Sequence, residues 1–118
     1  MVTRKVFSYD EFSDSLLVSN KAENERVRKN FMFGDFIISL TGNGKIVGLE
    51  IRDISNLFHE YGFDPNILNN IKDVELIVLV KKDFIFLGIK LIGIMKSQKF
   101  EQKIPLGYFP RQSTPITN

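Results

Sequence analysis

The chain has 118 residues, of which 43% are hydrophobic and 25% charged, and its net charge is +2. This length suffices for a single domain, residues 1–118, with its own core, and the composition is not that of a disordered chain. The absence of cysteine excludes disulfides, thiolate metal sites and a cysteine nucleophile. The start, MVTRKVFSYDEF, has no apolar segment typical of a signal peptide, so we expect a cytoplasmic protein.

Five short strands are expected in the first half, because runs of β-branched and aromatic residues alternate there with turn residues. The first three strands, expected to be antiparallel neighbours, cover residues 3–9, 14–20 and 25–33. The other two form a hairpin that begins at residues 36–41 and returns through the sequence GNGK, residues 42–45.

The GNGK sequence predicts the register of this hairpin. Asn43 and Gly44 both tolerate positive φ, which favours a two-residue type I′ turn. The expected core-facing pairs are Leu40 with Val47, Ile38 with Leu49, and Phe36 with Ile51. Gly48 and Glu50 then point away from the core, because side chains alternate along a strand.

Two short helices are predicted after the hairpin. Asp53 is the expected N-cap of a helix at residues 54–61, and Gly62 ends it. Asp64, followed by proline, starts a second helix at residues 65–71.

Three further strands are expected at residues 74–80, 84–95 and 98–104, and residues 111–118 are expected to fray. The segment 74–95 is strongly apolar, but charged residues interrupt it too early for a membrane-spanning helix. The predicted fold class is therefore α+β: mainly antiparallel β-sheet with two short helices and a C-terminal three-strand meander.

Part of the first half resembles a small prokaryotic family, domain of unknown function 2283. The resemblance rests on the string GKIVGLEI and on Tyr9, Asp10, Asp14, Leu16, Asp35, Ile37, Ile38 and Ser55. It covers about residues 6–57 and leaves residues 58–110 as a C-terminal extension. It implies a compact antiparallel sheet with a short helix and no assigned activity. Because family members are sometimes encoded beside small toxin-like proteins, it also implies a protein partner.

Catalytic chemistry has little support in the sequence. Asp10, Asp14, Glu50 and Asp53 are candidates for a metal or acid–base cluster, but roles in turns and at a helix start explain them better. His59 is the only histidine, so no second imidazole completes a metal pair. We expect no enzyme activity, no cofactor and no metal.

The distribution of charge suggests one alternative function. Residues 1–80 contain nine Lys and Arg against twelve Asp and Glu, whereas residues 81–118 contain seven against two. The candidate nucleic-acid contacts are Lys90, Lys96, Lys99 and Lys103, which lie near the aromatic rings of Phe84, Phe86 and Phe100. Against this reading, lysines on strand edges also prevent aggregation, and arginine is scarce in this region.

The strand at residues 84–95 is apolar on both faces. The candidate interface residues are Ile85, Leu87, Ile89, Leu91, Ile92 and Ile94. The N-terminal strands within the same chain, or a second subunit, would cover the exposed face. We therefore predict a noncatalytic module that forms a homodimer or larger homo-oligomer or binds a protein partner, with nucleic-acid binding as the alternative.

Overall fold

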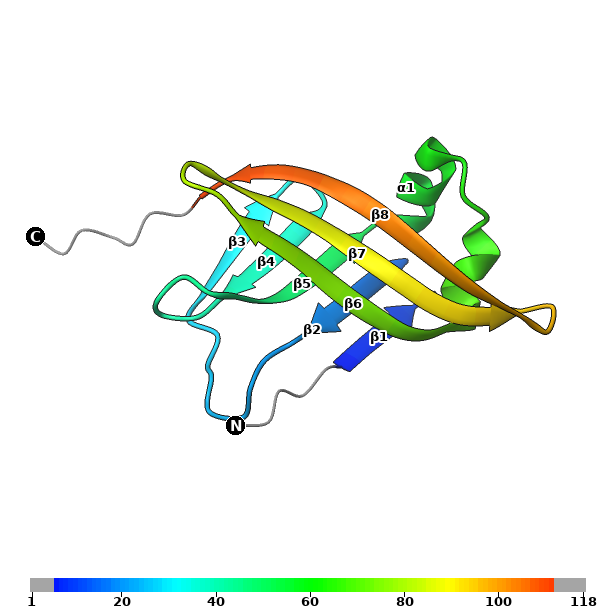
Figure 1. Cartoon of the computed structure of the whole chain (residues 1–118), viewed down its shortest axis with the longest axis horizontal. Helices are drawn as coiled ribbons and strands as arrows, with labels where there is room; N and C mark the ends of the chain where they lie inside the picture. The colour runs from blue at the N-terminus through cyan, green and yellow to red at the C-terminus, as the bar shows by residue number, and fades with distance from the viewer. Residues whose placement is uncertain (1–5, 112–118) are drawn as a thin grey trace, which may run out of the picture.

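The computed structural model describes residues 6–111, which form two antiparallel sheets packed face to face (Figure 1). The N-terminal sheet has the strand order β1-β2-β5-β4-β3, and the C-terminal sheet has the order β6-β7-β8. The N-terminal strands are β1 (Val6–Asp10), β2 (Ser15–Ser19), β3 (Lys29–Phe33), β4 (Phe36–Leu40) and β5 (Ile46–Arg52). The C-terminal strands are β6 (Ile71–Val80), β7 (Phe84–Met95) and β8 (Gln98–Pro110). The predicted fold class is confirmed.

Two short helices connect the sheets. Helix α1 (Ile54–Tyr61) has the predicted bounds, and Gly62 ends it as predicted. The second helix, η1 (Pro65–Asn70), is a 3-10 helix, and its N-cap Asp64 accepts a hydrogen bond from the backbone N–H of Asn66 at 2.9 Å.

The third strand was expected beside the second, but β3 lies at the far edge of the N-terminal sheet. It pairs with β4, whereas β2 pairs with β5. The β2–β5 register places Leu16 opposite Ile51 and Val18 opposite Leu49. All four side chains are at most 1% exposed, so this pairing aligns the apolar faces of two strands that are distant in sequence.

The turn of the β4–β5 hairpin differs from the predicted type I′. Of its two central residues only Gly44 has positive φ, at 85°. Thr41 and Lys45 close a three-residue loop through a 2.9 Å backbone hydrogen bond, and a bulge follows. Leu40 consequently pairs with Ile46 and not with Val47. The predicted pairs of Ile38 with Leu49 and of Phe36 with Ile51 are confirmed.

The core lies between the inner faces of the two sheets. Its fully buried residues include Leu16, Val18, Leu49 and Ile51 from one sheet and Leu87, Ile89, Leu91 and Ile104 from the other. Ile54 and Phe58 of α1, both 0% exposed, extend the core. Each such side chain stabilises the fold by roughly 1.5–3 kcal/mol relative to exposure.

Strand β8 is longer than predicted, reaching Pro110 instead of residue 104. A shift in register near Gly107 lets the strand continue past Pro105. The hydroxyl of Tyr61 donates a 2.7 Å hydrogen bond to the Pro105 carbonyl oxygen, which ties α1 to β8. Of the tail expected to fray, residues 112–118 lie outside the described residues.

Candidate functional site

Asp14 is a structural residue that caps α1. Its carboxylate accepts hydrogen bonds from the Tyr9 hydroxyl at 2.9 Å and from both the backbone N–H, at 3.1 Å, and the hydroxyl of Ser55. Ser55 lies in the first turn of α1. The predicted cap, Asp53, makes no side-chain hydrogen bond of this kind and adopts a left-handed conformation with φ 56°. Asp53 therefore occupies the predicted N-cap position, but the side chain that caps the helix is that of Asp14.

The other acidic candidates do not converge on a site. Asp10 accepts hydrogen bonds at 3.0 Å from the Phe12 N–H and the Ser13 hydroxyl, both in its own turn. Glu50 lies on the outer face of the N-terminal sheet, as predicted, opposite Ile37. Within residues 6–111, no group of three His, Cys, Asp or Glu side chains is placed to hold a metal ion. No helix in this range has the length and apolar character needed to cross a membrane.

Replacing Asp14 with alanine should lower the free energy of unfolding by about 2–3 kcal/mol, because the buried end of α1 and the Tyr9 hydroxyl lose their acceptor. Urea unfolding measures this loss. Burial, together with the hydrogen bond to Asp14, raises the pKa of Tyr9 to about 12, and the substitution should lower that pKa in a spectrophotometric titration.

The matched control is Asp10→Ala in the same turn, where the hydrogen bonds are exposed, and it should cost less than about 1 kcal/mol. Equal losses for the two variants would contradict the capping role of Asp14.

The structure divides the six predicted interface residues between two faces of β7. Ile85, Leu87, Ile89 and Leu91 are buried against the N-terminal sheet, with exposures of 6%, 0%, 0% and 0%. Their prediction as interface residues is corrected, because the same chain already covers them. Ile92 and Ile94 lie on the opposite face, and Ile94 is 48% exposed.

This opposite face, which we call the outer face of the C-terminal sheet, carries an apolar cluster at one end. Its members are Ile77, Leu79, Phe84, Phe86 and Tyr108. The ring of Tyr108 lies 5.1 Å from that of Phe84 and 5.2 Å from that of Phe86, measured between centroids. Tyr108 is 67% exposed and Leu79 is 50% exposed. The largest side chains of the cluster are therefore packed against one another and still open to solvent.

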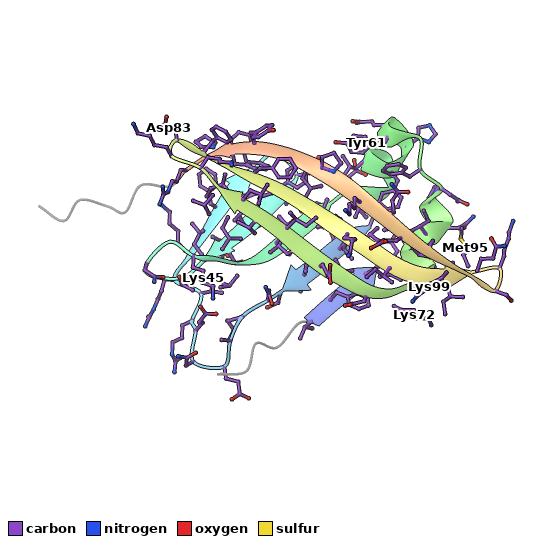
Figure 2. All side chains as sticks on the ribbon, viewed as in Figure 1. Lys45, Tyr61, Lys72, Asp83, Met95 and Lys99 are labelled. Carbon is purple, nitrogen blue, oxygen red and sulfur yellow. The ribbon has the colours of Figure 1, made fainter. Side chains whose placement is uncertain are left out.

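The four predicted nucleic-acid lysines lie toward the other end of the same face and in its adjoining turn. Lys103 is paired with Lys90 across β7 and β8, Lys99 lies opposite Ile94, and Lys96 is in the turn between these strands. Figure 2 shows Lys99 and Met95 at the end of the sheet opposite Asp83.

Acidic side chains neutralise the most central of these lysines. The Lys90 ammonium lies 2.9 Å from a Glu101 carboxylate oxygen and 3.1 Å from one of Glu75. These hydrogen bonds raise the pKa of Lys90, and the bond from Lys90 lowers the pKa of Glu101. The lysines therefore do not form a continuous basic surface.

A search of curated proteins matches the chain to uncharacterized protein MJ0789 of Methanocaldococcus jannaschii. The two are 36% identical over 91 residues, which make up 77% of this chain and 75% of the relative. The chain belongs to the family of this archaeal protein. The name of the relative specifies no activity. No family model matches the chain, so its resemblance to domain of unknown function 2283 stays a prediction. No solved structure matches it either.

A cleft lies beside the inner side of β6 in this family member, and the sequence analysis did not predict it. The cleft has a volume of about 920 Å³, and Lys45, Lys82, Asp83 and Arg111 are among its polar lining residues. Its apolar lining comprises Ile46, Leu76, Val78, Val80 and Ile85. The signal available in the sequence was the uninterrupted apolar run LIVLV at residues 76–80, which exceeds what one buried face requires.

Proposed function

We propose that this chain is a cytoplasmic, noncatalytic interaction module that self-associates through its C-terminal sheet. The observation that carries this proposal is the apolar surface left uncovered on β6, β7 and β8. Leu79, Val80, Phe84 and Tyr108 are between 39% and 67% exposed and gather at one end of this sheet. A noncatalytic role is supported by the acidic side chains, since Asp14 caps a helix and Asp10 stabilises its own turn.

Self-association is the simplest way to cover such a surface. Clustered apolar groups on the surface of a small protein mark interaction sites, and two-fold symmetric homodimers are the most common soluble oligomers. Within residues 6–111, the N-terminal sheet packs against the inner face of β7, whereas Leu79, Phe84 and Tyr108 stay exposed, so another molecule can cover them.

Light scattering after gel filtration should give twice the chain mass of 13.6 kDa. The dimer should persist at high salt, because burial of apolar area is not screened by ions. Leu79→Lys, which places a charge at a side chain that is 50% exposed, should yield a folded monomer.

Leu17→Lys is the matched control, since Leu17 is 45% exposed on the outer face of the N-terminal sheet. It should leave the dimer intact. A parent chain that remains at 13.6 kDa at high protein concentration would refute self-association.

Nucleic-acid binding is the alternative function, and the outer face supports it less well. Lys96, Lys99 and Lys103 are exposed, but Glu101 lies between two of them in sequence and contacts Lys90. A phosphate backbone approaching this surface would therefore meet a carboxylate among the ammonium groups.

A further inference from the structure

The strand β6 presents an open edge. Within residues 6–111, β6 pairs with β7 along one side, and no described strand pairs with its other side. The C-terminal sheet has three strands, whereas the facing N-terminal sheet has five. The row of N–H and C=O groups along such an edge is a template for a further strand.

The other sheet edges are poorly suited to accept a strand. The edge strand β8 contains Pro105 and Pro110, which have no N–H to donate, and its register shifts near Gly107. The edge strands β1 and β3 have only five residues each. Strand β6 has ten residues, and its last five, LIVLV at residues 76–80, include neither a charge nor a proline. Natural edges usually carry such protective residues, so their absence here indicates pairing.

Both sides of this edge strand are incompletely covered. Toward the inner side, Leu76, Val78 and Val80 line the cleft described above, and Val80 is 56% exposed. Toward the outer side, Leu79 is 50% exposed and Ile77 is half-buried. A strand added beside β6 would cover apolar side chains on both sides at once.

We propose that β6 of one copy pairs antiparallel with β6 of a second copy, about a two-fold axis beside Val78, so that the two C-terminal sheets become one continuous sheet. This inference rests on the self-association proposed above and assigns its surface. Each Val78 lies opposite its symmetry mate. The other facing pairs are Leu76 with Val80, Ile77 with Leu79 and Glu75 with Lys81.

Charge complementarity selects this register. Side chains alternate between the two faces along a strand. A two-fold axis perpendicular to the sheet places inner side chains of one copy opposite inner side chains of the other, so the axis must lie beside a residue and not between two residues. The neighbouring register centred on Ile77 places Glu75 opposite Leu79, and the one centred on Leu79 places Lys81 opposite Ile77. The register centred on Val78 alone places each of residues 76–80 opposite another of these residues, and it places Glu75, which also contacts Lys90, opposite Lys81.

Cysteine cross-linking tests this register directly, because the chain contains no cysteine of its own. Directly opposite residues in an antiparallel pair have Cα atoms about 4.5–5.5 Å apart, a separation that a disulfide can span. Val78→Cys should therefore shift from the one-chain to the two-chain position on a non-reducing gel after mild oxidation, and a reductant should reverse the shift.

Leu79→Cys is the matched control. The two cysteines of such a dimer would be diagonal neighbours across the paired strands. Their Cα atoms would be about 7–8 Å apart, which is too far for a disulfide. Neither Leu79→Cys nor Ile77→Cys should cross-link alone, whereas an equal mixture of the two should, because these positions face each other. The mixture also provides a test that does not depend on a substitution at Val78.

The outcomes separate this inference from the proposed function. A parent chain of twice the monomer mass, with cross-linking by Val78→Cys and by the mixture, supports both. A dimeric parent in which neither forms a disulfide overturns pairing through β6 and leaves self-association through another surface. A monomeric parent overturns both proposals.

Discussion

Leu87→Glu should unfold the chain. Leu87 is 0% exposed and lies in the core between the two sheets. Within residues 6–111, no polar or charged residue is buried. The carboxylate would have no partner there, and an unpaired buried charge costs several kcal/mol, a large part of the roughly 5–15 kcal/mol that stabilises a domain. Circular dichroism and proton NMR spectra of the purified variant should show loss of the β-sheet signal and of dispersed resonances.

Two controls separate the effect of charge from the effect of changed shape. Leu87→Met keeps the site apolar with little change in volume and should cost less than about 1.5 kcal/mol. Ile92→Glu places the same charge on the outer face of β7, where Ile92 is half-buried, and the chain should remain folded. A folded Leu87→Glu variant would contradict the assignment of this face of β7 to the core.

Gly93→Ala should cause the second largest loss of stability. A Cβ atom built on Gly93 would overlap the backbone carbonyl oxygen of Asn70 and the ring of Phe100. Asn70 ends η1, so the methyl group would push this helix away from β7, and backbone yields less readily than a flexible side chain. Overpacking of this kind typically costs 1–3 kcal/mol and occasionally more, so we expect a loss of about 3 kcal/mol in urea unfolding.

Gly42→Ala is the control for this substitution. Its Cβ atom would make an ordinary 3.6 Å contact with the Cγ atom of Arg28, and the residue is exposed. The free energy of unfolding should change by less than about 0.5 kcal/mol. A Gly93→Ala variant as stable as this control would mean that η1 does not pack closely on β7.

Local signals predicted most of the individual elements. The bounds of α1 follow from an apolar pattern that ends at Gly62, and η1 begins where Asp64 accepts a hydrogen bond from Asn66. The strand β7 has the predicted bounds, Phe84–Met95, because turn residues flank a long β-branched run on both sides. These features depend on residues within a few positions of one another, so the sequence contains the information directly.

The predictions for the candidate site were less successful because they depended on contacts between distant residues. The sequence shows that both faces of β7 are apolar, but it does not show which face the N-terminal sheet covers. Four predicted interface residues are therefore in the core, and only Ile92 and Ile94 lie on the outer face. The open edge of β6 could not be identified either, since strand order decides which strand ends a sheet.

The α+β class, the two short helices and the C-terminal meander follow from the sequence alone, because hydrophobic period and turn chemistry act locally. Contacts between distant segments place β3 at the far edge, Asp14 at the start of α1 and Leu87 in the core. Asp14 and Ser55 are 41 positions apart, and the pairing of β2 with β5 places the β1–β2 turn at the start of the helix, where their hydrogen bonds form. Two apolar faces of one strand are indistinguishable in the sequence. Which face is buried depends on the elements that pack against it and not on the residues of that strand alone.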